Sequence, residues 1–167
     1  HTGVSIAVSF AARYPEYVER MVLHGVPFYT PEEREARLAR PHFDQTPAAD
    51  GSHLQRRFEF SRKMASGASL EAIHWSTVQF YWAGPLEWYG HHAAFNFDVG
   101  RDLVKLKSPT LIMSNTGDSL HMAVERIKNL GLDFSYAVMD GGTYHIVYDE
   151  GVPWAKTVAD FILGGKI

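Results

Sequence analysis

The sequence contains no cysteine, which excludes disulfide bonds and thiolate metal sites. It also contains no apolar run of about 18 residues, the length that a membrane-spanning helix needs. Neither sign of charge dominates, because 16 basic and 19 acidic side chains give a net charge of −3. Such a balance supplies no electrostatic attraction to nucleic acid or to an anionic membrane. We therefore expect neither as a partner, and the absence of cysteine leads us to expect a cytoplasmic protein.

The sequence does contain enough apolar material for one globular core, with 46% hydrophobic residues in a chain of 167. Small and apolar side chains fill residues 3–12, which predicts a helix buried on more than one side. Pro15 ends this helix. The short apolar run Met21–Leu23, closed by Gly25 and Pro27, then predicts a buried parallel strand.

The middle of the chain carries helix signals and no strand pattern. Thr30, followed by Pro31 and Glu33, predicts a helix that begins with a capping box and runs to about Arg40. The polar residues 41–52 predict a loop. Further helices are predicted over residues 54–65, 70–81 and 85–95, the second of them capped by Ser69.

The last third of the chain alternates strands with helices. Residues 109–113 and 134–139 predict strands, and each is followed by a predicted helix, over residues 120–130 and 153–163. Residues 97–107 are expected to connect this part to the preceding helices. The alternation predicts a doubly wound parallel sheet.

Two segments near the start resemble those of a known family. Residues 10–15, Phe-Ala-Ala-Arg-Tyr-Pro, together with Met21–Leu23, resemble the helix and strand that follow the nucleophile elbow of the α/β-hydrolases. The resemblance aligns Gly3 with the second elbow glycine, Thr2 with the variable residue before it, and His1 with the nucleophile. A histidine therefore stands where the family has serine, aspartate or cysteine.

The resemblance implies an α/β fold that is the C-terminal portion of a doubly wound parallel α/β-hydrolase sheet with an inserted helical cap. Residues 1–30 would form the elbow helix and the next strand of the core, residues 31–96 the cap, and residues 97–167 the rest of the core. Three strands alone would leave an open, apolar sheet edge. We therefore expect the N-terminal half of the same fold as a partner, as a separate chain or segment.

Asp118 and His145 carry the strongest chemical signal. Each follows a predicted strand, at the end where functional groups gather in open parallel sheets. The resemblance places Asp118 as the acid and His145 as the base of a catalytic triad, in the family's order. We expect them to be joined by a hydrogen bond of about 2.6–3.2 Å. We also expect His1 to lie near His145 and to be uncharged, because a helix N-terminus disfavours positive charge. Asp98, the competing carboxylate, is interpreted as structural.

The resemblance also implies supporting residues. The backbone N–H of Thr2 would be one arm of an oxyanion hole. No histidine pattern has the spacing of metal ligands, since His91 and His92 are adjacent, and we expect neither a metal nor a cofactor. The residues expected to bind substrate are His24, Trp82, Trp88 and Tyr144.

These features predict a hydrolase that acts on an ester, lactone, C–C or C–X bond of a small, largely apolar organic molecule. An Asp–His pair would activate water, with a non-standard His at the elbow. Two alternatives remain open. The same scaffold could run a lyase or cofactor-free reaction that needs only a base and an oxyanion hole, or the protein could bind a ligand without catalysis.

Overall fold

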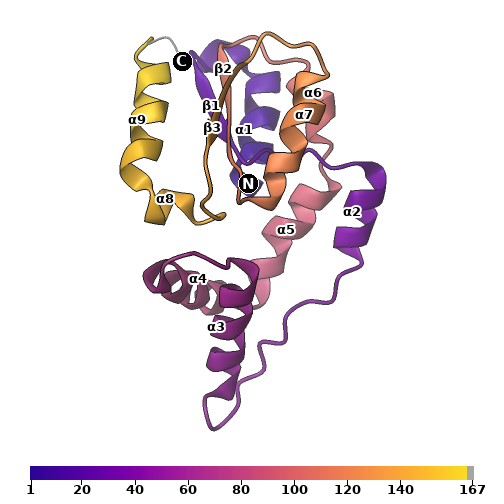
Figure 1. Cartoon of the computed structure of the whole chain (residues 1–167). Coiled ribbons are helices and arrows are strands. Elements are labelled where there is room, and N and C mark those ends of the chain that lie inside the picture. Colours follow the sequence, from indigo (N-terminus) through magenta and orange to yellow (C-terminus); the bar gives the residue numbers. More distant parts are fainter. Residues whose placement is uncertain (165–167) are drawn as a thin grey trace.

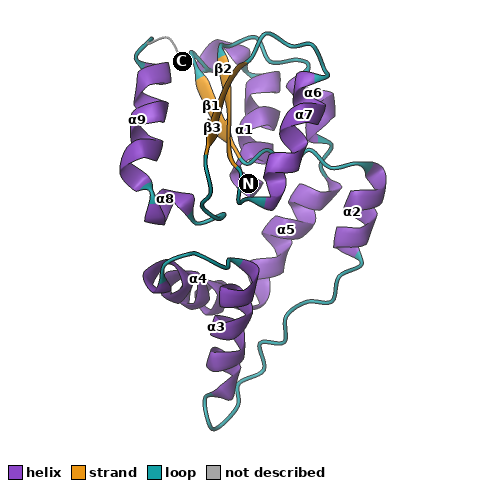
Figure 2. Cartoon of the chain, viewed as in Figure 1, coloured by secondary structure: helices purple, strands orange, loops and turns teal. Residues whose placement is uncertain are grey.

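The structure is a computed structural model, and it describes residues 1–164. Its centre is a three-stranded parallel sheet in the order β1 (Met21–His24), β2 (Thr110–Asn115) and β3 (Ser135–Met139) (Figures 1 and 2). The register pairs Leu23 with Ile112, and Ile112 with Tyr136. All residues of β2 are buried, as a central parallel strand requires. The parallel sheet predicted from the alternating pattern is confirmed.

Successive side chains of β2 point to opposite faces of the sheet, and all of them are buried. Helices therefore cover both faces. Ile112 packs on one face against α1 (Thr2–Arg13), α6 (Val99–Leu103) and α7 (Ala123–Lys128). Leu111 and Met113 pack on the other face against α9 (Gly151–Ile162). Figure 1 shows α9 on one side of the strands and the other three helices opposite. The result is a helix–sheet–helix sandwich.

Residues 31–96 are helical and contain no strand. They form α2 (Pro31–Leu38), α3 (Ser52–Met64), α4 (Leu70–Ala83) and α5 (Glu87–Asn96), with a 3-10 turn at Gly84–Leu86. The predicted capping box is present, since Thr30 Oγ1 accepts from the N–H of Glu33 while the Glu33 carboxylate accepts from the N–H of Thr30. In Figure 1, α3 and α4 lie beyond the end of the sheet at which α8 (Ile146–Asp149) begins.

Two short helices depart from the sequence prediction. Helix α6 stands in the stretch expected to be a connection, where Asp98 caps it by accepting from the N–H of Arg101 at 3.3 Å. The helix expected over residues 120–130 is a 3-10 turn at Ser119–Met122 followed by the shorter α7. Helices of four to six residues contain too little of the 3.6-residue period to be seen in a sequence.

Within residues 1–164, none of the helices combines the length and the apolarity needed to cross a membrane.

The outer side of α1 and both edges of the sheet are open. Within residues 1–164, β1 and β3 each pair with β2 alone. Helix α1 exposes Ile6 to 70% and Phe10 to 47%, and these residues line a groove of about 420 Å³ shared with α5. Large apolar side chains exposed as a group mark this groove as a candidate interaction surface.

Candidate functional site

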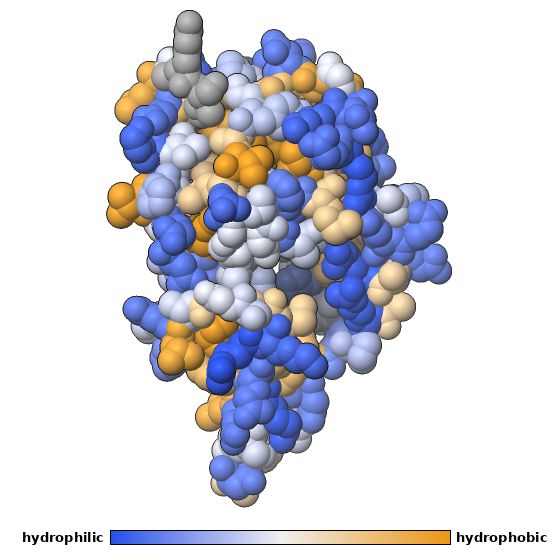
Figure 3. Space-filling model, viewed as in Figure 1, coloured by the Kyte–Doolittle hydropathy of each residue, from blue (hydrophilic) through white to orange (hydrophobic). Residues whose placement is uncertain are grey.

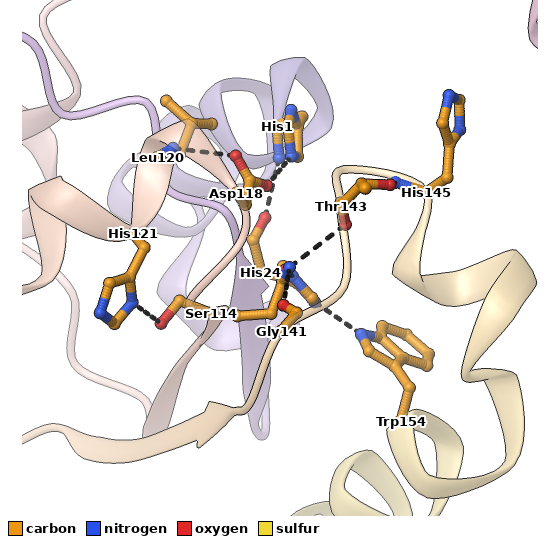
Figure 4. Close-up of polar contacts among 11 residues, drawn as sticks. His1, His24, Ser114, Asp118, Leu120, His121, Gly141, Thr143, His145 and Trp154 are labelled. Atoms are coloured by element: carbon orange, nitrogen blue, oxygen red, sulfur yellow. Dashed lines mark hydrogen bonds and ion pairs between the residues drawn. The ribbon is translucent and has the colours of Figure 1, made fainter. Parts of the chain in front are cut away.

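The chemically active side chains gather where the three strands end. His24 is the last residue of β1 and Asn115 is the last residue of β2. The turn after β2 carries Asp118, and the turn after β3 leads to His145. Because the strands are parallel, these carboxyl ends meet at one edge of the sheet (Figure 4).

His1 and Asp118 form a close side-chain pair in which Nε2 lies 2.6 Å from Oδ2 (Figure 4). His1 is the residue at which α1 begins, and its amino group donates to the carbonyl of His24 at 2.8 Å. An ionised carboxylate only accepts hydrogen bonds, so Nε2 carries the proton and donates it. In the neutral ring, Nδ1 is then the nitrogen that is free to accept a proton.

Gly25 provides the space for the His1 ring. Its φ of +62° lies in the left-handed region that favours glycine. A Cβ at this position would lie 2.7 Å from Cδ2 and 2.9 Å from Nε2 of His1. Any larger residue would therefore push the imidazole away from Asp118. Gly25, expected only to close a strand, also shapes the site.

Asp118 is ionised although it is only 4% exposed. Burial is the strongest single influence on its pKa and acts to raise it. The hydrogen bond and charge of His1, together with the N–H of Leu120 that donates to Oδ1 at 2.8 Å, outweigh burial and hold the pKa below its ordinary value. The carboxylate can therefore orient the imidazole and stabilise its protonated form.

The expected hydrogen bond between Asp118 and His145 is not formed. One oxygen of Asp118 accepts from His1 and the other from Leu120, and the His145 ring points away from the carboxylate in Figure 4. His145 is buried, and its Nε2 has no hydrogen-bond partner within residues 1–164. The physical reason is the direction of the side chains: Asp118 is held by His1 and by the N–H of Leu120, and the ring of His145 is turned away from it.

Tyr144 lies near both histidines. Its ring centroid is 6.3 Å from that of His1 and 4.2 Å from that of His145. Burial lowers the pKa of His145 below its ordinary value, although the negative charge of Asp149 acts to raise it. At neutral pH His145 is therefore a neutral imidazole at this end of the sheet.

Asn115 joins the ends of all three strands, a role that no sequence motif marks. It is 0% exposed, and its amide group donates to the carbonyls of Gly141 at 3.0 Å and Thr143 at 3.2 Å. Its Oδ1 lies 3.1 Å from Nε2 of His24. Because Trp154 donates to Nδ1 of His24 at 2.6 Å, Nε2 carries the proton and donates to Asn115. The one available signal is an asparagine at the end of a predicted strand whose centre, residues 111–113, is apolar.

The turn that carries Asp118 packs directly on the turn that leads to His145. The N–H of Gly117 donates to the carbonyl of Gly141 at 3.0 Å. A Cβ on Gly117 would lie 1.8 Å from the carbonyl oxygen of Gly142, which leaves no room for any side chain. The spacing between the two turns is therefore set by backbone contact.

His1 lines a cavity of about 560 Å³ between the end of the sheet and the helices of residues 31–96. The surface is hollowed between these two parts in Figure 3. The core contributes Thr2, Ser119, Leu120 and Tyr144 besides His1. The helical segment contributes charged and aromatic side chains, among them Arg37, Arg40, Arg57, Phe60, Phe80 and Glu87.

The structure brings only some of the expected site residues to this cavity. Thr2 and Tyr144 line it. His24 does not line the cavity, because its ring is held by hydrogen bonds to Asn115 and Trp154. Trp82 is 85% exposed, and Trp88 lines a neighbouring hollow of about 430 Å³ instead. Aromatic residues occur on several sides of the helices, so the sequence could not distinguish those that face the cavity. Within residues 1–164, no cluster of three or more His, Asp or Glu side chains is placed to hold a metal ion.

The sequence matches no family model, and no curated protein is similar to it in sequence. The fold, however, is similar to several solved structures. E-2-(acetamidomethylene)succinate hydrolase has a TM-score of 0.70 at 16% identity, over 96% of this chain and 63% of that one. The enol-lactonase of Burkholderia xenovorans LB400 has a TM-score of 0.67 at 18% identity, over 96% and 62%. An α/β hydrolase enzyme from a deep-sea metagenome has a TM-score of 0.58 at 19% identity, over 99% and 64%.

The chain therefore has the fold of the C-terminal portion of an α/β-hydrolase, as the resemblance of its first segments implied. It spans less than two thirds of the length of these structures. At such low identity the likeness establishes the fold, and the reaction has to be argued from the side chains themselves.

We predict that His24 titrates below its ordinary value of 6.5. Burial lowers the pKa of His24 despite the bond to Asn115, and protonating Nδ1 would break the bond from Trp154. Below about pH 6.5 the unfolded chain binds more protons than the folded chain, so this histidine makes the free energy of unfolding fall as the pH falls. An NMR titration of the ring in the intact polypeptide measures the midpoint, with His24→Phe to assign the resonance. A midpoint at or above 6.5 would contradict the prediction.

Proposed function

We propose that this chain forms the catalytic part of a hydrolase in which the His1–Asp118 pair acts as the general base. The observation that carries the proposal is the 2.6 Å contact between Nε2 of His1 and the buried carboxylate, at an imidazole that lines the cavity. Asp118 fixes the tautomer in which Nε2 is protonated, and Nδ1 is the acceptor. A carboxylate–imidazole pair of this kind is suited to activating water.

The reaction supported best is hydrolysis of an ester or lactone. Nδ1 of His1 takes a proton from water while the oxygen of that water forms a bond to the carbonyl carbon. The carbonyl oxygen becomes an oxyanion, which the backbone N–H of Thr2 stabilises, since first-turn amides have no acceptor within their helix. The C–O bond to the leaving group then breaks, and the leaving oxygen receives the proton from His1.

His145 is the second candidate for the base. It is neutral and buried, and its Nε2 has no hydrogen-bond partner within residues 1–164, although His145 is not among the residues that line the cavity. In this alternative His145 activates water and His1 positions the water or the substrate. Tyr144, which lies near both rings and lines the cavity, would contact substrate in either case.

We further propose that residues 31–96 act as a cap over the core formed by residues 1–30 and 97–167. The support for this division is that the cavity draws its lining from both parts. A cap excludes water from the reacting groups, which strengthens the electrostatic interaction between His1 and Asp118.

The free edge of β1 supports a partner that extends the sheet. We propose that the occupant is a set of further parallel strands, the N-terminal half of the same fold as a separate chain or segment. The bond from the amino group of His1 to the carbonyl of His24 already lies along this edge. The exposed apolar side chains of Ile6 and Phe10 lie beside it on α1 and would be covered by the same partner.

The first test replaces the proposed base. In the intact polypeptide, we expect His1→Ala and Asp118→Asn each to lower kcat/KM for 4-nitrophenyl esters by about 10²- to 10⁴-fold, the usual contribution of a general base. The double variant should lose little more than either single variant, because the two residues act as one unit. Exposed His74 on α4 provides a matched control, and His74→Ala should retain full activity.

The same assay includes His1→Ser and His145→Ala, with circular dichroism to verify the fold. Loss of activity in His145→Ala together with full activity in His1→Ala would transfer the role of base to His145. Unchanged turnover in both His1→Ala and Asp118→Asn would rule out the proposed pair.

The second test concerns the open edge. The isolated chain is expected to self-associate and to bind the apolar dye ANS, because Ile6 and Phe10 remain exposed. Ile6→Lys should reduce both effects, whereas Val104→Lys, at an exposed position on the connection after α6, should not. An isolated chain that is monomeric, compact and cooperatively folded would overturn the proposal of a partner.

A further inference from the structure

Three arginines line the cavity that contains His1, and all come from the helical segment. Arg37 lies on α2, Arg40 follows that helix, and Arg57 lies on α3. Glu87 is the carboxylate in the lining, and it is already 3.3 Å from Nδ1 of His91. The wall supplied by these helices is therefore strongly cationic.

These arginines have no anionic partner in the described part of the chain. Within residues 1–164, no carboxylate lies within 4.0 Å of Arg37, Arg40 or Arg57, whereas Arg101 and Arg126 are both paired. In addition, Nε of Arg37 and Nε of Arg57 are buried without any hydrogen-bond partner. Buried polar atoms are rarely left unsatisfied in a native structure, so a missing acceptor is indicated.

Aromatic rings hold the guanidinium groups of these two half-buried arginines in place. Arg57 lies 3.8 Å from the ring centroid of Phe80, and Arg37 lies 4.2 Å from that of Tyr29. Stacking on a ring face leaves the N–H groups at the edge of the guanidinium plane available. Those edges have the geometry that receives a carboxylate through two parallel hydrogen bonds. Burial also lowers the pKa of Arg57, which reflects a charge with too little compensation.

We infer that the cavity binds substrates that carry a free carboxylate, with Arg57 and Arg37 receiving this group while the hydrolysable bond lies at His1. The inference rests on the proposed hydrolytic function and names its substrate class. It replaces the expectation of a largely apolar substrate. The aromatic rings do not form a purely apolar wall, because arginine side chains stack on them. The neighbouring hollow shares these arginines but does not contain His1, so a carboxylate bound there would not position a reacting bond.

The test compares two esters of equal chain length in the intact polypeptide. Mono-4-nitrophenyl glutarate ends in a carboxylate, and 4-nitrophenyl valerate ends in a methyl group. We expect kcat/KM to be about ten- to hundredfold higher for the glutarate ester, as charge-assisted hydrogen bonds contribute. Arg57→Gln and Arg37→Gln should raise KM for the glutarate ester, so that the ratio of the two kcat/KM values falls to about one. Arg62→Gln, at an exposed position of α3 away from the cavity, is the matched control.

Direct binding separates this inference from the proposed function. Calorimetry with glutarate and with its uncharged diamide needs no turnover. Binding of glutarate that is lost in Arg57→Gln supports the carboxylate site even if neither ester is hydrolysed, which would reject only the hydrolase. Equal hydrolysis of both esters, with no preference for glutarate over the diamide, would overturn the carboxylate site and leave the hydrolase intact. Absence of both hydrolysis and binding would reject both.

Discussion

The hydrogen bonds of Asn115 are the constraint on which the geometry of the site depends. This side chain is completely buried at the end of the central strand, and its amide reaches the ends of both neighbouring strands. A buried amide that lost one of these partners would leave a polar group unsatisfied, at a cost of about 1–3 kcal/mol. The network therefore holds His24 and the turn before His145 in one arrangement relative to β2.

This arrangement determines which imidazole reaches the acid. Asp118 follows Asn115 by three residues, and the turn that carries it packs by backbone contact on the turn after β3. With these turns in place, the side of the carboxylate next to Gly25 is open, and the His1 ring enters there. His145 lies against Tyr144, and its Nε2 has no partner within residues 1–164. The two histidines are thus chemically distinct, one paired with a carboxylate and one neutral in a buried position.

The two parts of the cavity contribute different chemistry. In the proposed function, the core supplies the groups that move protons, because strand ends and a helix N-terminus meet there. The helical segment supplies aromatic rings and the arginines that rest on them. A chemical step at His1 and recognition by Arg57 thus come from separate segments of the chain. Substitutions in one part can change substrate preference without changing the base, a common arrangement in folds that host many reactions.

Local sequence determined most of the elements and the position of the site along the chain. Apolar runs at residues 21–23, 109–113 and 134–139 became the three strands, because period and length are properties of a single segment. Thr30 and Ser69 cap the helices that they were expected to cap. The rule that functional groups follow parallel strands likewise located the turns of Asp118 and His145.

Only the tertiary structure decided which side chains meet. The pairing of Asp118 with His1 rather than with His145 depends on the space over Gly25, a contact between residues far apart in the sequence. The arginine wall likewise depends on which faces of α2 and α3 turn toward the core. The periodic pattern of the sequence does not specify those faces, because aromatic and charged residues occur on all sides of these helices. Strands and helices follow from neighbouring residues, but a catalytic pair and a binding wall follow from packing between distant segments.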